Sequence, residues 1–309
     1  MSVVVFGSLN LDLVAQTPRL PVVGETVLGS HFLTASGGKG ANQAVAAARL
    51  GASTAMVGCV GNDRFGEQLL AGLRESGVET QGVRVDENTH SGVAVVSVDQ
   101  QGENTIVIVP GANGQVGEVD IEQLKVLLPD ATTLLLQLEI PLPAVEAAAR
   151  VARDAGVTVV LDPAPVPEDF PEDLYSLVDI LTPNEIEASQ LLGVPVHDRE
   201  TALAAASAFR RRGAKTAVVT LGARGLAYAT ATESAFVPAF AVEAIDTTAA
   251  GDAFNGALAA ALDRGLPWTD ALRWGAAAGA LSTTQAGAQP SLLDLETLEE
   301  ALAAKPVSS

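Results

Sequence analysis

Short apolar runs alternate with longer stretches of helical periodicity along most of this chain. The apolar runs predict strands at residues 3–6, 54–60, 133–138, 158–161, 179–181 and 217–221. Apolar residues that recur every three to four positions predict helices at residues 41–50, 65–74, 144–153 and 201–211. Because strands that alternate with helices build a parallel sheet covered on both faces, we expect an α/β fold with a central, mostly parallel sheet.

Two segments interrupt this alternation. Residues 12–36 contain several turn residues and no convincing helix, and residues 91–109 contain two strand patterns, 92–98 and 104–109, around a polar turn. The two segments predict either a small sheet that projects over the carboxyl edge of the main sheet or ordinary edge hairpins. We find neither internal repeats nor low-complexity segments.

Composition and charge narrow the class of ligand. The chain has 309 residues, of which 48% are hydrophobic and 18% are charged, as in a globular protein. A net charge of −19 repels polyanions, so we expect no nucleic acid and no acidic membrane surface among the partners. A phosphate compound would therefore have to bind through local features, such as helix N-termini, backbone amides, a few cations or a metal ion that it carries.

Cysteine usage and the apolar stretches predict where the protein works. Cys59 is the single cysteine, so an internal disulfide is impossible, and this favours a reducing, cytoplasmic location. The first ten residues lack the basic start and the long apolar run of a signal peptide. The apolar stretch 253–262 is interrupted by Asn255, so we expect no membrane-spanning segment.

Several common catalytic motifs are absent. Gly38 and Lys39 lack the upstream glycine and the following Ser or Thr of a P-loop, and no GxGxxG opens the first predicted helix. Neither HExxH nor GxSxG occurs. These absences disfavour dinucleotide enzymes and the hydrolases that are built on those motifs.

Polar residues near the N-terminus are candidates for binding a polyhydroxyl ligand. Asn10 and Asp12 follow the first predicted strand, and positions i and i+2 of an extended segment point the same way. Both residue types are also common in turns. The glycine-rich segment 36–43 runs into a predicted helix, so its backbone can approach an oxygen-rich or anionic ligand. Lys39 inside it is one of four lysines, against fourteen arginines; a flexible glycine hinge is the alternative.

Two segments in the second half of the chain combine helix starts with polar groups. Asn184 and Glu187 share a helix face and can either hold a hydrated Mg²⁺ with phosphate oxygens or form a capping pair. In segment 246–256, small residues and Gly251 can form a turn whose amides converge on an anion. Asp252 then lies in the first helical turn, where a carboxylate can accept the proton of a hydroxyl that attacks a phosphoryl group. We expect the helix start to lower the pKa of Asp252, although an acidic residue also suits this position for structural reasons alone.

Together these segments resemble the phosphofructokinase-B-type carbohydrate kinases and, within them, the ribokinase family, from about residue 3 to residue 291. The resemblance is carried by residues 7–12, 37–43, 137–139, 162–165, 182–187, 220–225, 246–256 and 287–291. Segment 246–256 marks the superfamily, whereas 37–46 and 137–139 point more narrowly to ribokinases. Two positions depart from the common pattern: Asp162 stands where Asn is frequent, and Ala249 where many members have Gly.

The resemblance implies a fold, an activity and an assembly. The fold would be a single ribokinase-like α/β domain over residues 1–309, with a small β-sheet lid formed by insertions at about 12–36 and 91–109. The activity would be transfer of the γ-phosphoryl group of ATP to the 5-hydroxyl of D-ribose, which gives ribose 5-phosphate. The lid would also form the contact of a homodimer.

The resemblance also assigns site residues. Asp252 would be the catalytic base, and the sugar would be bound by Asn10, Asp12, Gly38, Lys39, Asn42 and Glu139. ATP and its Mg²⁺ would be bound by Asn184, Glu187, Thr220, Gly222 and Gly225, with the amides around Ala249, Ala250 and Gly251 holding the transferring phosphoryl group. An activating K⁺ would lie at Asp246, Thr248, Ser282, Gln285, Gly287 and Ser291, mostly on backbone carbonyls.

Two alternatives remain. The first is a kinase for another small sugar or for a nucleoside, but a nucleoside base usually binds an aromatic platform, and Phe32 is the only aromatic residue of the two irregular segments. The second is a non-catalytic relative that senses a sugar or a nucleotide. The presence of Asp252 argues against the second, because a binding module has no need of a base.

Overall fold

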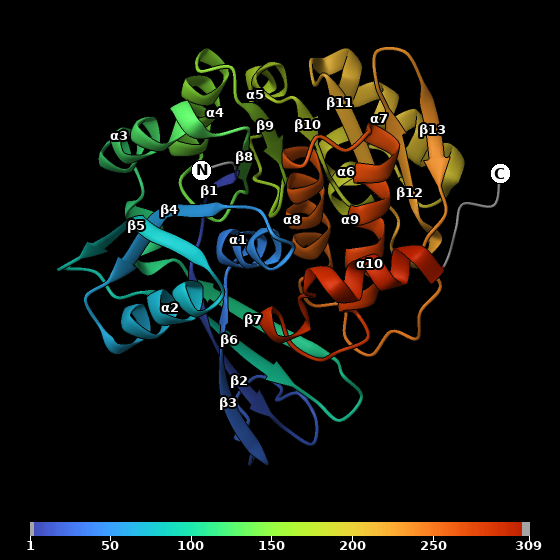
Figure 1. Cartoon of the computed structure of the whole chain (residues 1–309). Coiled ribbons are helices and arrows are strands. Elements are labelled where there is room, and N and C mark those ends of the chain that lie inside the picture. Colours follow the sequence, from blue (N-terminus) through green and yellow to red (C-terminus); the bar gives the residue numbers. More distant parts are fainter. Residues whose placement is uncertain (1–2, 305–309) are drawn as a thin grey trace.

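The computed structural model describes residues 3–304 and contains two β-sheets (Figure 1). The larger sheet consists of β1 (Val3–Phe6), β4 (Thr54–Gly61), β5 (Val78–Asp86), β8 (Thr133–Leu136), β9 (Thr158–Leu161), β10 (Ile180–Leu181), β11 (Thr216–Thr220), β12 (Leu226–Ala229) and β13 (Ser234–Val237). Its spatial order is β13-β12-β11-β10-β9-β8-β1-β4-β5. In this order, all neighbours from β11 to β5 pair in parallel, and β12 and β13 add antiparallel at the other edge. The predicted α/β fold with a mostly parallel central sheet is confirmed.

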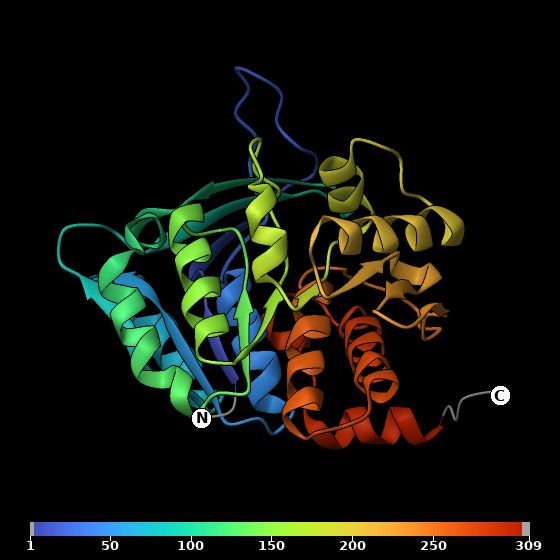
Figure 2. The ribbon, with the colours of Figure 1, turned by 90° about the horizontal axis from the view of Figure 1, so that it is seen from above.

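Helices cover both faces of this sheet. They are α1 (Lys39–Arg49), α2 (Arg64–Glu75), α3 (Glu118–Leu127), α4 (Leu142–Asp154), α5 (Glu172–Leu177), α6 (Glu185–Leu192), α7 (Arg199–Arg212), α8 (Ala250–Asp263), α9 (Trp268–Ser282) and α10 (Leu295–Ala304). Successive residues of β1 point to opposite faces, so Val3 and Val5 pack with α1, α2 and α8 to α10, whereas Val4 and Phe6 pack with α3 to α7. In Figure 2, α8, α9 and α10, in orange and red, gather on one side of the strands.

The small sheet lies apart from the large one. It consists of β2 (Asn10–Gln16), β3 (His31–Gly37), β6 (Gly92–Val98) and β7 (Asn104–Val109), in the order β3-β2-β6-β7 (Figure 1). Strands β2 and β6 are parallel, and the two outer strands pair antiparallel to them. The small sheet that the sequence offered as one of two alternatives is therefore present. The description of residues 12–36 as turns was incomplete, because that segment includes most of β2 and β3.

The sequence patterns also missed regular elements at the edges of the large sheet. The polar strand β5 and the short strands β12 and β13 were not predicted. The predicted strand at residues 133–138 ends at Leu136, because residues 137–139 already leave the sheet at its carboxyl end. These positions matter for function, since parallel sheets bind their ligands beyond the carboxyl ends of their strands.

Helices α1 and α8 touch through their smallest residues. A methyl group added to Gly256 of α8 would lie 2.4 Å from Cβ of Ala46 and 2.8 Å from the carbonyl oxygen of Gln43, both on α1. Only glycine fits at this distance, so the two helix backbones approach closely. The N-termini of α1 and α8 are thereby held together at the same end of the sheet.

Within residues 3–304, no helix combines the length and the apolar character that crossing a membrane requires.

Candidate active site

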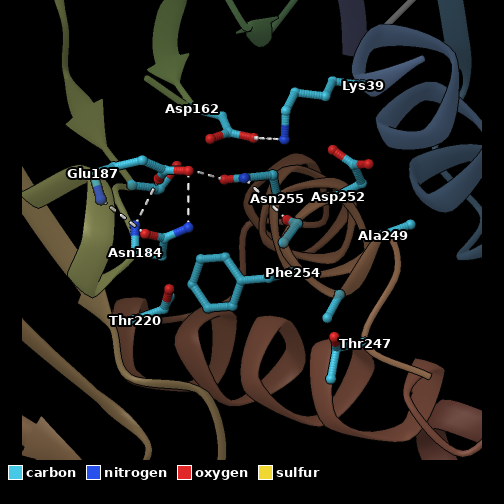
Figure 3. A pocket seen from close by; sticks show the side chains of 13 residues that line it. Lys39, Asp162, Asn184, Glu187, Thr220, Thr247, Ala249, Asp252, Phe254 and Asn255 are labelled. Carbon is cyan, nitrogen blue, oxygen red and sulfur yellow. Dashed lines mark hydrogen bonds and ion pairs between the residues drawn. The ribbon is translucent and has the colours of Figure 1, made fainter. Parts of the chain in front are cut away.

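A cavity of about 220 Å³ opens where the carboxyl ends of β9, β10 and β11 meet the N-termini of α1 and α8 (Figure 3). It is lined by Lys39, Asp162, Thr182, Asn184, Glu187, Thr220, Thr247, Ala249, Ala250, Gly251, Asp252, Phe254 and Asn255. Among these residues, Lys39 is the one with a positively charged side chain, and it faces the carboxyl groups of Asp162, Glu187 and Asp252. The cavity thus brings together residues that are far apart in the sequence, from Lys39 to Asn255.

Asp252 lies in the first turn of α8 and is 4% exposed. Its Oδ2 accepts a hydrogen bond from Nδ2 of Asn42 at 2.9 Å, and its Oδ1 accepts one from Nε2 of Gln43 at 3.1 Å. Burial raises the pKa of Asp252, although Lys39 and these two hydrogen bonds oppose the rise. The expectation that the helix start lowers this pKa was wrong, because desolvation outweighs the favourable contacts.

Lys39 supplies the positive charge of the site. Its ammonium lies 3.9 Å from Oδ2 of Asp162. Burial lowers the pKa of Lys39, but the surrounding carboxylates, Asp162 first and then Asp252, outweigh that effect and raise it. Lys39 therefore stays protonated at neutral pH and can contact an anionic or oxygen-rich ligand.

The predicted sugar-binding residues gather beside the start of α1. Oε2 of Glu139 accepts hydrogen bonds from the hydroxyl of Ser8 at 2.5 Å and from the backbone N–H of Lys39 at 3.0 Å. Gly38 has φ +88°, and a methyl group there would lie 2.7 Å from the backbone nitrogen of Asn10. Close backbone packing therefore requires glycine at position 38, and this reason differs from the flexible hinge that was the alternative.

The two polar residues of β2 belong to the same group. The side chain of Asp12 adjoins Gly37, where a methyl group would lie 2.5 Å from Oδ2 of the aspartate. Burial, followed by the charges of Glu139 and Asp252, raises the pKa of Asp12 to about 7. Oδ1 of Asn10 accepts a hydrogen bond from Nδ2 of Asn113 at 2.8 Å, which fixes the orientation of the Asn10 amide.

Asn42 completes the sugar-side group with an unsatisfied atom. Its nitrogen donates to Asp252, but its Oδ1 is buried and has no hydrogen-bond partner in the described part of the chain. Buried amide oxygens are nearly always bonded, because leaving one unpaired costs about 1–3 kcal/mol. A ligand hydroxyl placed here could donate the missing hydrogen bond.

Asn184 and Glu187 form the capping box that was one of their two predicted interpretations. Oδ1 of Asn184 accepts from the N–H groups of Ile186 and Glu187, and the carboxylate of Glu187 accepts from the backbone and side-chain nitrogens of Asn184. Both side chains nevertheless line the cavity, together with Thr220 (Figure 3). The capping bonds fix the two residues at the cavity wall and do not remove them from it.

Two glycines predicted for the nucleotide lie outside this cavity. Gly222 and Gly225 have φ +54° and +114° in the turn after β11. A methyl group at Gly225 would lie 2.2 Å from the carbonyl oxygen of Val237, so this glycine is required by packing against β13. A methyl group at Gly222 would meet no neighbour.

The turn before α8 has the shape expected of an anion site. Ala249 has φ +60°, the left-handed conformation that costs a non-glycine residue roughly 1 kcal/mol or more. Ala249, Ala250 and Gly251 all line the cavity, and the first amides of a helix lack acceptors within it. Backbone strain at the mouth of a helix whose amides meet a cavity is consistent with a phosphoryl site.

The residues predicted for K⁺ lie in two adjoining segments. Oδ1 of Asp246 accepts from the N–H of Thr248 at 2.9 Å, and its Oδ2 accepts from the N–H of Gly287 at 2.8 Å. The carbonyl of Ser282 accepts from the N–H of Gln285 at 3.3 Å. The hydroxyl of Ser291 donates to the carbonyl of Ala288 at 2.8 Å. The bond from Gly287 to Asp246 joins the two segments beside the N-terminus of α8, and the other bonds shape each segment locally.

The donor atoms of the site fit a metal that is carried by a substrate better than a resident metal. Within residues 3–304, no three His, Cys, Asp or Glu side chains converge as a ready-made metal site. Magnesium commonly keeps several waters and binds one or two carboxylates plus substrate phosphates, and a cavity with Asp162 and Glu187 fits that mode. Potassium binds oxygens alone, which fits a set of backbone carbonyls and hydroxyls.

Comparison with known proteins agrees with this arrangement. Residues 1–295 match the family described as pfkB family carbohydrate kinase. The chain is 43% identical to the ribokinase of Haemophilus influenzae, over 96% of both chains. It is 35% identical to the deoxyribokinase of Salmonella typhi, over 98% of this chain and 99% of the other.

Solved structures show the same relationship. The structure of Arabidopsis thaliana ribokinase complexed with ribose and ATP superposes with a TM-score of 0.89 at 35% identity, covering 97% of this chain and 98% of the other. The chain belongs to the pfkB family of carbohydrate kinases.

The sequence missed several residues that build the site. Gln43 and Gln137 lie in the segments 37–43 and 137–139 that carry the resemblance but were given no individual role, Asp162 was noted without a role, and Asn113 was not considered. Gln137 and Asp162 each come directly after a strand, at the carboxyl end of the sheet, and that placement was a usable signal. Asn113 gave no local signal, because its contacts reach back more than 100 residues to Leu9 and Asn10.

Proposed function

We propose that this protein is a ribokinase, which transfers the γ-phosphoryl group of ATP to the 5-hydroxyl of D-ribose and produces ribose 5-phosphate and ADP. The observation that carries the proposal is the position of Asp252. It lies at the start of α8 between the polar group around Asn42 and the cavity that contains Glu187. The identity of 43% to a curated ribokinase over 96% of the chain supports ribose as the sugar.

The sugar side of the site supplies directional hydrogen bonds. We assign Asn10, Asp12, Gly38, Lys39, Asn42 and Glu139 to the sugar. The amide nitrogen of Asn10 and the unpaired Oδ1 of Asn42 are complementary, since one hydroxyl can accept from the first and another can donate to the second. A sugar that lacks one of these hydroxyls leaves a buried polar group unpaired.

Asp252 acts as the base on the attacking hydroxyl. As the 5-oxygen bonds to the γ-phosphorus and the bond from that phosphorus to ADP breaks, the hydroxyl proton passes to a carboxylate oxygen of Asp252. The raised pKa of Asp252 makes it a stronger base than an exposed aspartate. The amides around Ala249, Ala250 and Gly251 and the ammonium of Lys39 stabilise the charge on the transferring group.

ATP occupies the remainder of the cavity. We assign Asn184, Glu187, Thr220, Gly222 and Gly225 to the nucleotide and its Mg²⁺; the two glycines lie in the turn after β11 beside Thr220, outside the cavity wall. Bound Mg²⁺ neutralises phosphate charge, which matters because Asp162, Glu187 and Asp252 also face this space. Glu187, held by its capping bonds, presents a fixed carboxylate to the hydrated ion.

We further propose an activating K⁺ at Asp246, Thr248, Ser282, Gln285, Gly287 and Ser291. The carboxylate of Asp246 is already bonded to Thr248 and Gly287, so it supports the loop, and carbonyl oxygens would contact the ion. Because this loop leads directly into α8, an ion here fixes the amides that hold the phosphoryl group. Turnover should therefore fall when K⁺ is replaced by a larger organic cation such as tetramethylammonium.

The small sheet supports a homodimer. Phe32, Val95, Ile106, Val107 and Ile108 are between 45% and 68% exposed. Apolar surface on an isolated, partly uncovered sheet marks an interaction site. We propose that the small sheet is the lid of the sugar site and the contact between two copies of this chain, and that the enzyme works in the cytoplasm, as its single buried thiol at Cys59 suggests.

The second candidate substrate is 2-deoxyribose. The observation that favours it is the identity of 35% to a curated deoxyribokinase over 98% of the chain. A nucleoside is less suitable, because Phe32, the aromatic residue of the small sheet, is 68% exposed and its strand partner is Ala15, away from the sugar-side residues.

The deciding experiment measures ADP release by the purified protein with ATP, Mg²⁺, K⁺ and D-ribose, with 2-deoxyribose and nucleosides in parallel. We expect fast turnover that requires ribose, and a kcat/KM for ribose that exceeds that for 2-deoxyribose by up to about 10⁴-fold. Equal values for the two sugars would contradict the hydrogen-bonding scheme of the sugar site. No turnover with any of these acceptors, from protein that binds ATP, would favour a non-catalytic role.

A further inference from the structure

Gln43 occupies the centre of the polar network behind the cavity and contacts two of its carboxylates at once. Its Nε2 donates to Oδ1 of Asp252 at 3.1 Å and to Oδ2 of Asp162 at 3.0 Å. Its Oε1 accepts from Nε2 of Gln137 at 2.7 Å. Gln43 and Gln137 are both fully buried, so no water competes for these bonds.

The chemistry of the partners sets the orientation of the Gln43 amide. An amide oxygen cannot donate a hydrogen bond to a carboxyl oxygen, so the amide nitrogen must face the accepting oxygens of Asp162 and Asp252. An amide nitrogen carries two hydrogens, and here each carboxylate receives one. The donor from Gln137 meets the remaining oxygen, so all three bonds fail together if the amide turns over.

These contacts fix the carboxylate of Asp252 in two directions. Gln43 holds one oxygen and Asn42 holds the other, from consecutive positions at the start of α1. Asp162 also faces the ammonium of Lys39 at 3.9 Å, so the network links the cation of the site to its base. A base must be placed to within fractions of an ångström of the proton it takes, and displacement by 1 Å can cost about 100-fold in rate.

We propose that Gln43 is a positioning residue that fixes Asp252 for phosphoryl transfer, and that Gln137 holds the Gln43 amide in the orientation that serves both carboxylates. This inference rests on the proposed function only where it concerns the reaction. The orientation of Asp252 itself is a property of the folded protein and can be measured without turnover.

The experiment compares Gln43→Met, which keeps the length of the side chain and removes the amide, with wild type. Thr54→Val is the matched control, because Thr54 is a buried residue of β4 whose hydroxyl bonds only to the carbonyl of Ala52, outside the site. The two readouts are the separate kcat and KM for ribose, and the titration of the Asp252 carboxyl carbon by ¹³C NMR, assigned with Asp252→Asn.

We expect Gln43→Met to lower kcat by about 10- to 100-fold while the KM for ribose changes by less than about threefold. The NMR titration of Asp252 should move to higher pH, because the carboxylate loses a hydrogen bond that stabilises its charged form. Thr54→Val should change neither value, even if it lowers the melting temperature equally.

Three results would overturn the inference: an unchanged titration of Asp252 in folded Gln43→Met, a kcat within about twofold of wild type, or an equal loss of kcat in Thr54→Val. If Gln43→Met does not fold, Gln137→Met decides instead, since it leaves the amide of Gln43 in place but frees its orientation, and a loss of about threefold to tenfold in kcat is expected. If wild type phosphorylates no sugar, the proposed function fails, and the titration still decides whether Gln43 controls Asp252.

Discussion

The two sheets of this protein each contain a strand rich in apolar residues, but the two strands differ completely in burial. All eight residues of β4 are buried, whereas all six residues of β7 are exposed, although β7 ends in the run Ile106–Val109. The difference lies in what covers them. Helices of the same chain pack on both faces of the large sheet, but within residues 3–304 no helix covers β7, the outer strand of the small sheet.

An apolar strand therefore does not by itself predict a core strand. In the large sheet, burial provides stability and a fixed platform for the site at its carboxyl edge. In the small sheet, exposed apolar side chains are surface that another molecule can cover. Substitutions at the carboxyl edge of the large sheet should therefore affect the reaction or folding, whereas substitutions on the exposed strand β7 should affect assembly.

The largest effect is expected at the carboxyl edge of the large sheet, where Asp252 lies. Asp252→Asn should lower kcat by about 10²- to 10⁴-fold, because the amide cannot take the hydroxyl proton. Ribose binding, measured by calorimetry, should survive, and the melting temperature should stay the same or rise, since a buried carboxylate with a raised pKa is replaced by a neutral group. Turnover near the wild-type value would mean that Asp252 is not the base.

The next effect concerns the small sheet. Val107 is 62% exposed and pairs with Val95 across β6 and β7, so Val107→Glu places a charge within the proposed contact. We expect the dimer dissociation constant to rise by at least about 30-fold, the size of an interface hot spot, as measured by sedimentation velocity. Val126→Glu, on the exposed side of α3 at 72% exposure, is the control and should leave assembly intact. A dimer that tolerates Val107→Glu would have to form elsewhere.

A smaller effect tests how tightly α1 and α8 are packed against each other. Gly256→Ala should destabilise the protein by about 1–3 kcal/mol, because the added methyl collides with Ala46 and with the backbone of α1. Gly72→Ala makes the same change within α2, where the nearest neighbour would be Ser36 Oγ at 3.4 Å, and should stabilise by about 0.5–1 kcal/mol. Urea unfolding of both variants provides the test; equal effects would refute the close α1–α8 contact.

The last effect concerns pH, at the junction of the two sheets. The pKa of Asp12 is raised from 3.8 to about 7, so the folded state binds the proton more tightly than the unfolded chain does. Its contribution to stability is fully present below about pH 4 and is lost as the pH rises through 7, with a slope of at most about 1.4 kcal/mol per pH unit. Asp12→Asn should flatten this part of the unfolding profile, whereas the exposed Glu75→Gln should not. Identical slopes in wild type and Asp12→Asn would contradict the raised pKa.

The sequence predicted the strands with continuous apolar runs best, since β1, β4, β8 and β9 sit between two helical layers. It missed β5 because an edge strand is covered on one side, and polar residues such as Glu79 then alternate with buried ones. The same limit applies to the site. Asp252, Asn42 and Gln43 all stand in motifs that can be identified locally, but the contact between Gln43 and Asp162 spans 119 residues, and no local pattern encodes it.

The close contact at Gly256 has a consequence for anyone who wishes to retarget this enzyme. Because α1 and α8 allow no methyl group between them, Asn42 on one helix and Asp252 on the other, to which we assign sugar binding and the base, are held at a fixed relative position. Enlarging the acceptor pocket by moving these helices apart would misplace the reacting groups before it created room. A wider substrate range has to be engineered from the small sheet, because its exposed strands can be changed without moving α1 or α8.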